Sequence, residues 1–289
     1  MKHFDKKQSR TTGIEWCSHT WNPFVGCSMK SAGCQNCYAM SLAKKLDKWG
    51  QKAYSGTWRE RGGKVTWTGK INKNTRSAFE KPLRIRQSSV IFVNSMSDFF
   101  HEGASNELRL EALEVMHNCP GHQFQVLTKR PENILKFVKE TGYKFPDNVW
   151  LGATVEDNRV KERVKHLRKV KAAIKFLSIE PLIGDIPSID LRGIDWVISG
   201  GESGPGARPM KYEWLCHVHE ATRKYDVAHF FKQYGKPQNN PLWDKTPKGR
   251  TPAAFVKEKD PVGKGGSKLL GKYWKEMPRG FKTAKIENL

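Results

Sequence analysis

From residue 90 onward, the chain alternates short apolar runs with longer amphipathic segments. The short runs are rich in Val, Ile and Phe and end in polar residues, which is typical of buried strands. We expect strands at residues 90–94, 124–128, 149–154, 174–178, 194–199 and 228–232. An earlier run, at 20–25, is a candidate first strand.

The segments between the strands have the spacing of apolar positions that predicts helices. We expect helices at 105–117, 131–140, 156–170 and 212–225, and one at 38–49 after the first strand. Pro131 stands at the first position of its helix, where a missing N–H costs nothing. Alternating strands and helices predict an α/β fold with a parallel sheet. We therefore expect a full or partial (β/α) barrel of about six to seven parallel strands over residues 1–236, with an open doubly wound sheet as the alternative.

Polar residues follow almost every predicted strand. In an α/β barrel the carboxyl ends of the strands form the active site, so this pattern predicts an enzyme site there. Two groups follow the strands at 90–94 and 124–128, and single residues or pairs follow the others. They are Asn94, Ser95, Ser97, Asp98, Thr128, Lys129, Arg130, Glu156, Glu180, Glu202, Ser203, Lys232 and Gln233. The glycines at 200–204 lack the spacing of a dinucleotide-binding motif.

Two regions lie outside this alternation. Residues 51–89 are basic and contain Trp58 and Trp67 among Lys and Arg, which fits either a packed insertion or a cap that grips nucleic acid by charge and stacking. Residues 237–289 are rich in Pro, Gly and Lys. They predict an irregular basic extension packed on the barrel, with a short ordered piece around 269–277.

The charge balance points to a polyanionic partner. Among 289 residues, 51 are Lys or Arg and 29 are Asp or Glu, a net charge of +22. Such an excess favours nucleic acid over a small phosphorylated substrate or an acidic protein, which would need fewer charges. The sequence contains no apolar run of about 18 residues and no apolar segment near residue 1, so we expect no membrane partner and a cytoplasmic location.

Four of the six cysteines fall close together, at Cys17, Cys27, Cys34 and Cys37. Without a secretion signal, a metal site is expected rather than disulfides. A structural zinc ion takes four ligands, so Cys17 or His19 would have to complete a zinc site. A [4Fe–4S] cluster held by Cys27, Cys34 and Cys37 would leave one iron open. The position of these three, in a loop after the first predicted strand, favours the cluster; zinc and free thiols are the alternatives.

The sequence WNPFVGC at 21–27, with GCQNCYA at 33–39, resembles the signature of the phage-associated three-cysteine-motif family, which is itself similar to radical S-adenosylmethionine enzymes. The resemblance continues at 92–98, 127–131, 150–156, 178–182, 200–204 and 231–235. Two features depart from radical S-adenosylmethionine enzymes: six residues separate Cys27 from Cys34, and the Gly-Gly-Glu segment follows a late strand. The amine-binding role of that segment is therefore not assigned to Glu202.

The resemblance implies a barrel in which the three cysteines hold a [4Fe–4S] cluster as metal ligands and catalytic residues. S-adenosylmethionine would bind the open iron through its amine and carboxylate, and an external one-electron reductant would start radical chemistry on the substrate. The residues assigned to cofactor binding are Tyr38, Asn94, Ser95, Ser97, Asp98, Thr128, Lys129, Arg130 and Glu156. Those assigned to the substrate are Glu180, Glu202, Ser203, Arg208, Lys232, Gln233, Trp58 and Trp67.

Together, cluster, barrel and charge predict a radical enzyme that modifies or repairs a nucleic-acid base, with DNA favoured over RNA. Phage association suggests DNA hypermodification and a location in the bacterial host cytoplasm. A base within a duplex would have to be flipped out, and residues 51–89 could hold the displaced strand. The alternatives are a non-catalytic nucleic-acid-binding protein with zinc or a cluster, and a radical enzyme for a small phosphorylated metabolite. The polar strand ends argue against the first, and the charge argues against the second.

Overall fold

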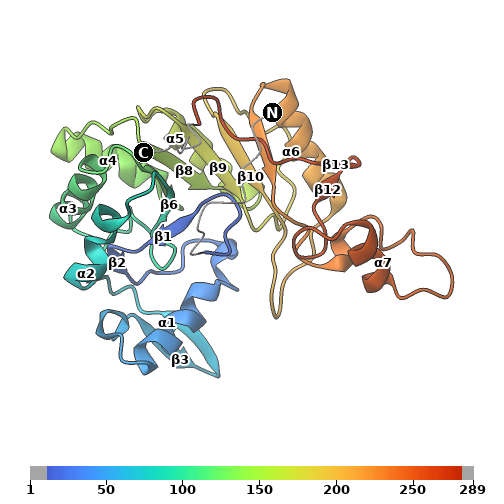
Figure 1. The fold of residues 1–289 in the computed structure, drawn as a ribbon, viewed down its shortest axis with the longest axis horizontal. Helices are drawn as coiled ribbons and strands as arrows, with labels where there is room; N and C mark the ends of the chain where they lie inside the picture. The colour runs from blue at the N-terminus through green and yellow to red at the C-terminus, as the bar shows by residue number, and fades with distance from the viewer. Residues whose placement is uncertain (1–11, 282–289) are drawn as a thin grey trace. The chain divides into compact units, whose positions relative to one another are not determined.

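The computed structural model describes residues 12–281 (Figure 1). The chain folds into two compact units, each described by itself below. The N-terminal unit comprises residues 12–153 and 169–174, and the C-terminal unit comprises 154–168 and 175–281. The basic insertion at 51–89 belongs to the first unit and residues 237–281 belong to the second.

The fold is α/β, with one all-parallel sheet whose strand order is β1-β6-β7-β8-β9-β10-β11. The strands are β1 (His19–Trp21), β6 (Val90–Val93), β7 (Gln123–Thr128), β8 (Val149–Thr154), β9 (Lys175–Ile179), β10 (Trp196–Ser199) and β11 (Ala228–Phe231). In the described chain β1 and β11 end the order, so the sheet does not close on itself. Neighbouring strands also follow one another in chain order across the sheet, whereas the strand order of a doubly wound sheet reverses. The partial barrel-like arrangement is therefore the confirmed form of the prediction.

In the N-terminal unit, strands β6 and β8 are buried along their whole length, as expected for parallel strands covered on both faces. Helices α3 (Asn106–His117) and α4 (Pro131–Thr141) lie to one side of these strands (Figure 1). The Ser105 hydroxyl accepts from the Leu108 N–H and caps α3, and α4 begins at Pro131 as predicted. Both predicted helices are confirmed within one residue at each end.

The predicted first strand at 20–25 is two strands instead of one. After β1 the chain turns at Asn22 and Pro23, and β2 (Phe24–Val25) then pairs antiparallel with β5 (Asn72–Lys73). Proline has no N–H for a parallel ladder, which explains why the first strand ends there. The β2–β5 pair ties the returning arm of the insertion to the segment that leads into Cys27.

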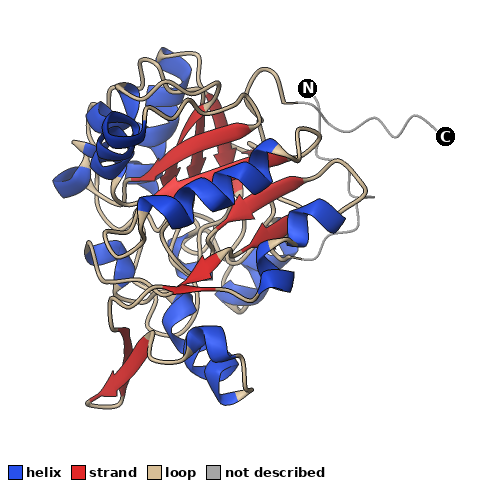
Figure 2. Ribbon diagram, turned by 90° about the vertical axis from the view of Figure 1, so that its left-hand side faces the viewer, coloured by secondary structure: helices blue, strands red, loops and turns tan. Residues whose placement is uncertain are grey.

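The insertion at 51–89 folds around a hairpin at the bottom of Figures 1 and 2. Strands β3 (Trp58–Arg61) and β4 (Lys64–Trp67) are joined by Gly62 and Gly63, which both have positive φ, the requirement of a tight two-residue turn. Helix α1 (Tyr38–Lys48) lies beside the hairpin. The other elements of the insertion are η2 (Lys52–Tyr54), α2 (Arg76–Phe79) and η3 (Lys81–Arg84).

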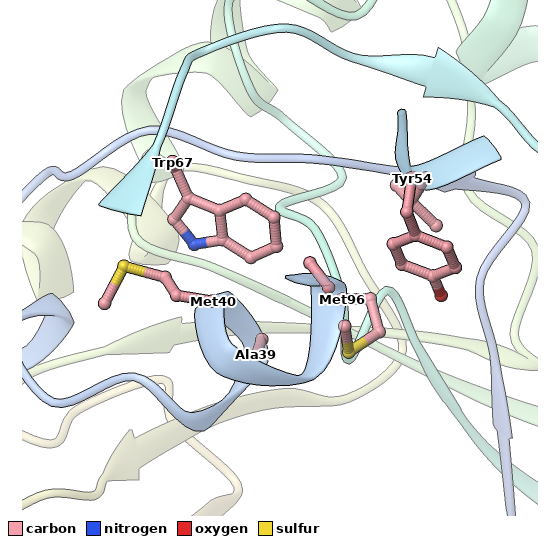
Figure 3. Close-up of a cluster of buried hydrophobic side chains, with 7 residues drawn as sticks. Ala39, Met40, Tyr54, Trp67 and Met96 are labelled. Carbon is pink, nitrogen blue, oxygen red and sulfur yellow. The ribbon is translucent and has the colours of Figure 1, made fainter. Parts of the chain in front are cut away.

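A buried hydrophobic cluster joins α1 to this insertion (Figure 3). The Trp67 ring lies over the first turn of α1, next to Ala39 and Met40, with Met96 and Tyr54 nearby. Cys27 and Cys37 pack against the same cluster. The insertion is therefore a packed element of the N-terminal unit, which was one of the two interpretations open from sequence.

The C-terminal unit contains β9, β10 and β11 and the helices that accompany them. The helix predicted at 156–170 is shorter than expected, consisting of η4 (Asn158–Val160) and α5 (Arg163–Arg168). The reason is that the Asp157 carboxylate accepts from the Arg159 N–H, which starts a separate turn. The remaining elements are α6 (Tyr212–Lys224), η5 (Pro237–Asn239), α7 (Pro252–Lys259), β12 (Lys268–Leu269) and β13 (Lys272–Tyr273).

The last described segment runs along the outer edge of β11. The Phe231 N–H donates to the Trp274 carbonyl at 2.8 Å, the Glu276 N–H donates to the His229 carbonyl at 3.1 Å, and Lys275 bridges Phe230 antiparallel. The ordered piece predicted around 269–277 is thus confirmed, and its end pairs with β11. No helix of residues 12–281 is long and apolar enough to cross a membrane.

Candidate functional site

Three cysteines occupy one continuous loop of the N-terminal unit. Cys27 follows β2, Cys34 ends the short 3₁₀ turn η1 (Ala32–Cys34), and Cys37 is the N-cap of α1. The Cys37 N–H donates to the Cys34 carbonyl at 3.2 Å, so the last two are fixed by consecutive turns. The loop therefore leads directly from the sheet into the first turn of α1.

The three loop thiols influence one another's pKa. Burial, assisted by Asp98, Cys34 and Cys37 and opposed by Arg130, raises the pKa of the Cys27 thiol to about 12. Burial also raises the pKa of Cys37, which the Ala39 N–H at the start of α1 and the Lys129 ammonium counteract. Both thiols keep some accessible surface, yet the atoms around them exclude enough water to disfavour the thiolate. Metal binding would therefore have to displace their protons.

Cys17 and His19, the alternative zinc ligands, lie at the other end of the strands. The Ser18 N–H donates to the Val90 carbonyl, and His19 pairs with Ile91, at the start of β6. The Cys27 loop lies at the end of β6, where the Gly26 N–H donates to the Met96 carbonyl. The structure therefore provides neither of the fourth ligands that the zinc interpretation named.

The donor set consists of three thiols on one loop, the ligand type of iron–sulfur clusters. Within residues 12–281, no three His, Cys, Asp or Glu side chains converge as ligands of a single metal ion. A four-iron cluster offers each thiolate its own iron, so the three sulfurs do not need to meet at one point. The apolar cluster against Cys27 and Cys37 and the backbone donors at the start of α1 are the kind of surroundings that such a cluster requires.

Asp98 lies behind this loop and is completely engaged by neighbours. Its carboxylate accepts from the Thr128 hydroxyl at 2.6 Å, the Lys129 N–H at 3.0 Å, Arg130 Nη1 at 2.9 Å and the Phe100 N–H at 3.0 Å. Asp98, Thr128 and Arg130 are at most 5% exposed. These three predicted cofactor-binding side chains therefore support the site from within, because their polar groups already bind one another.

Arg130 connects this buried network to the cysteine loop. Its Nη2 donates to the Ser28 hydroxyl at 2.8 Å, and its Nε donates to Glu102 at 2.8 Å. His101 Nε2 lies 2.7 Å from the same hydroxyl, and the Gly103 N–H donates to His101 Nδ1 at 2.9 Å. Because Nδ1 accepts, the neutral imidazole carries its proton on Nε2 and donates to Ser28. Burial, assisted by Arg130, lowers the pKa of His101 and favours that neutral form.

Sequence reasoning did not identify Ser28, His101 or Glu102 as parts of this network. Ser28 follows a candidate ligand directly, and the other two come shortly after Asp98 in the same polar segment. That proximity was the available signal. The sequence could not show that the Arg130 side chain, two residues after the end of β7, binds both Ser28 and Glu102.

Asn94 carries one of the buried polar atoms for which the described residues provide no hydrogen-bond partner. It has a φ of 60°, is 3% exposed, and its Nδ2 makes one long contact of 3.4 Å with the Phe24 carbonyl. No described residue donates to its Oδ1. A buried amide oxygen without a donor is costly, so this atom is suited to a ligand that brings an N–H or O–H.

The Ser95 and Ser97 side chains bind the segment that leads into the cysteine loop. The Ser95 hydroxyl donates to Asn22 Oδ1 at 3.3 Å, and the Ser97 hydroxyl donates to the Gly26 carbonyl at 2.5 Å. Tyr38 is different, because 59% of it is exposed while its hydroxyl donates to the Ser95 carbonyl at 3.3 Å. Tyr38 is thus exposed beside the third cysteine, and the cofactor contact expected from sequence stays a prediction.

The two tryptophans assigned to the substrate are packed inside the insertion. Trp67 is 5% exposed within the hydrophobic cluster of Figure 3. Trp58 packs against that cluster, donates through Nε1 to Asp47 at 2.8 Å and has the Lys44 ammonium over its ring. This placement corrects the stacking role predicted for Trp67, whose ring faces are covered by protein.

In the C-terminal unit, four of the residues predicted for the substrate form two ion pairs. Glu202 accepts from Arg208 through the N–H, Nε and Nη2, and Lys232 donates to Glu180 at 2.6 Å. Glu156, predicted for the cofactor, is 1% exposed and bound by Arg163 Nη1 at 2.8 Å.

Two predicted residues lie on loops that follow β10 and β11. Gln233 accepts from the Lys264 N–H at 3.0 Å, and Ser203 is half-buried. A Cβ on Gly201 would lie 2.1 Å from the Tyr234 carbonyl oxygen, so glycine is required for these loops to touch. The Gly-Gly-Glu segment therefore has a packing role in the C-terminal unit.

These features define an α/β protein with a parallel sheet whose strands follow chain order, and with a three-cysteine loop between β2 and α1. The chain belongs to the family described as "Protein of unknown function (DUF5131)", whose model matches residues 11–278. No curated protein and no solved structure matches it significantly.

Proposed function

We propose that this protein is a [4Fe–4S] enzyme of the radical S-adenosylmethionine type that modifies or repairs a nucleic-acid base, in DNA rather than RNA. The observation that carries the proposal is the grouping of Cys27, Cys34 and Cys37 in one loop, where the three thiols influence one another's pKa. When bound, the cluster and S-adenosylmethionine would supply one-electron radical chemistry, with an external reductant.

The protein's own residues would hold and shield that group. The cluster of Trp67, Met40 and Met96 keeps water away from one side of the cysteine loop. Arg130 fixes the loop through Ser28 and brings a positive charge that opposes the high pKa of Cys27. The packing would fix the arrangement of the sulfurs, and the Arg130 charge would favour the Cys27 thiolate.

Two side chains are suited to the polar end of the cofactor. Asn94 Oδ1 is a buried acceptor and would take a hydrogen bond from the methionine amine. The Lys129 ammonium lies close enough to Cys37 to lower its pKa, and would attract the methionine carboxylate. Tyr38, exposed at the start of α1, offers an aromatic face for the adenine.

Support for a nucleic-acid substrate comes from charge. The net charge of +22 is accompanied by exposed Arg59, Arg61 and Lys64 on the hairpin that packs against α1. These cations belong to the same unit as the cysteine loop. A polynucleotide would therefore meet positive charge around the proposed reaction site.

The test is anaerobic purification with analysis of iron, sulfide and zinc, followed by electron paramagnetic resonance of the reduced protein. We expect one [4Fe–4S] cluster per chain, and 5′-deoxyadenosine when dithionite and S-adenosylmethionine are added. The Cys27→Ala variant should lose both, whereas Cys119→Ala, a buried cysteine outside the loop, should keep both. Stoichiometric zinc, or a full cluster that yields no 5′-deoxyadenosine with or without nucleic acid, would overturn the proposal.

A further inference from the structure

The exposed face of α1 differs in composition from the face that packs against the hydrophobic cluster. Its inner side, with Ala39, Met40 and Ala43, is buried against the hydrophobic cluster (Figure 3). Its exposed positions follow the helical repeat and form a narrow stripe. They are Tyr38, Ser41, Lys45, Lys48 and Trp49.

Large aromatic rings stand at both ends of this stripe. Trp49, directly after the last residue of α1, is 72% exposed, and Tyr38 at the first residue is 59% exposed. Trp49 is the most exposed large hydrophobic residue of the described chain, and covering its ring would remove apolar surface from water. With a rise of about 1.5 Å per residue, the two residues are about 16 Å apart along the helix.

The charge between the two rings is purely positive. Lys45 lies one turn before Trp49 on the same side, Lys48 is beside it, and the exposed Lys52 follows. The Glu60 carboxylate of the hairpin is paired with Lys44, and Lys48 adds to the lowering of its pKa. The acid of this helix, Asp47, is turned to the hairpin, where it accepts from Trp58 Nε1.

Cations near a helix C-terminus interact favourably with the helix dipole. The lysines alone are therefore no evidence for a binding surface. The helix dipole does not explain why Trp49 is exposed. An aromatic platform flanked by cations is the combination that binds single-stranded nucleic acid, through base stacking and phosphate contacts.

We infer that the outward face of α1 binds single-stranded nucleic acid, with Trp49 as the main stacking platform and Lys45 and Lys48 on the phosphates. This inference rests on the proposed function and gives its substrate a path. Tyr38 follows Cys37 directly, so a strand lying along this face from Trp49 leads to the cysteine loop. The stacking that sequence assigned to Trp58 and Trp67 belongs instead to Trp49.

The test measures fluorescence anisotropy of a labelled mixed-sequence DNA single strand with the full-length, anaerobically prepared protein. Trp49→Ala should weaken binding by about five-fold to 150-fold, the usual effect of one stacked base, and Trp49→Phe should restore most of it. Lys45→Glu/Lys48→Glu should weaken binding and reduce the log–log salt slope by about 1.4, from two lost contacts at about 0.7 each. Circular dichroism and iron content should match the wild type, because these residues are exposed.

The matched control is Lys139→Glu/Lys144→Glu, which makes the same charge change at exposed positions in and just after α4. It should leave affinity near that of the wild type. If Trp49→Ala binds as tightly as the wild type, or the control weakens binding as much as Lys45→Glu/Lys48→Glu, the inference about α1 is wrong although the proposed function stands. If the wild type binds no polynucleotide at about 50 mM salt, the nucleic-acid part of the proposed function fails as well.

Discussion

Arg130 Nη1 lies 2.9 Å from Asp98 Oδ2, and both side chains are almost completely buried. The pair joins the segments that follow two neighbouring strands, β6 and β7. The same guanidinium holds Ser28, the residue after Cys27. One buried cation therefore couples the sheet to the cysteine loop.

Removing the charge of Asp98 should destabilise the protein strongly. Asp98→Asn leaves the buried Arg130 guanidinium without its buried counter-charge, and we expect the free energy of unfolding to fall by about 3 to 5 kcal/mol. Urea denaturation followed by circular dichroism measures it. Glu102→Gln is the matched control, because the Glu102 side chain is 55% exposed and screened by water. Equal losses for the two variants would contradict a buried ion pair.

The three loop cysteines should behave as a group. Replacing Cys27, Cys34 or Cys37 with Ala should each abolish the brown colour and the bound iron, because three thiolates are the minimum for the proposed cluster. Cys17→Ala should keep both, because Cys17 lies before β1 at the far end of the strands. Absorbance and iron analysis of anaerobic samples decide this, and loss of metal in Cys17→Ala would count against the assignment.

Gly26→Ala should disturb the cysteine loop. Gly26 has a φ of 98°, and an added Cβ would lie 2.1 Å from the Lys70 carbonyl oxygen. Either β5 or the loop must move, so we expect a loss of about 1 to 3 kcal/mol in the free energy of unfolding and a lower iron content. Gly121→Ala, where a Cβ meets nothing within 4 Å, should change neither. A fully loaded, equally stable Gly26→Ala variant would show that the β2–β5 junction does not shape the site.

Acid should destabilise the C-terminal unit through a buried histidine pair. His219 Nδ1 lies 2.9 Å from His229 Nδ1, and burial lowers the pKa of both below 6.5. The folded state therefore resists protonation while the unfolded state accepts it. The stabilisation is complete above pH 6.5 and is lost as the pH falls below it, by about 1.4 kcal/mol per pH unit for each proton. Urea denaturation between pH 8 and pH 5 measures the slope.

His217 should show the opposite dependence and serves as the contrast. The Asp185 carboxylate, 2.9 Å from Nδ1, raises the pKa of His217. Its stabilisation is present below pH 6.5 and is lost as the pH rises, so His217→Asn should differ from the wild type only at low pH. A stability of the His217→Asn variant that stays flat from pH 8 to pH 5 would contradict the role of the pair.

Strand and helix positions were predictable because buried parallel strands are continuous apolar runs. The run at 149–154 coincides with β8, and the runs around it are within two residues of the observed strands. The split at Pro23 was not predicted, because antiparallel pairing of β2 with β5 depends on residues about 50 positions later. Local patterns contain no such pairing.

The cysteine loop was predictable from spacing, but the engagement of the polar residues was not. Asp98 and Arg130 were expected to face a ligand because each follows a strand, and the structure pairs them with each other instead. For the tryptophans, sequence shows aromatic residues among cations and cannot show which side of a hairpin packs. Trp67 faces α1, whereas Trp49, which no pattern singled out, is exposed.

The segment from Trp274 to Glu276 has a consequence for how the chain can be shortened. It satisfies the backbone groups on the open side of β11, which would otherwise be a free edge. A chain that ended before Trp274 would present that edge to other molecules as a template for intermolecular pairing. We therefore expect such truncations to aggregate through β11, whereas an affinity tag placed after this segment leaves the edge protected.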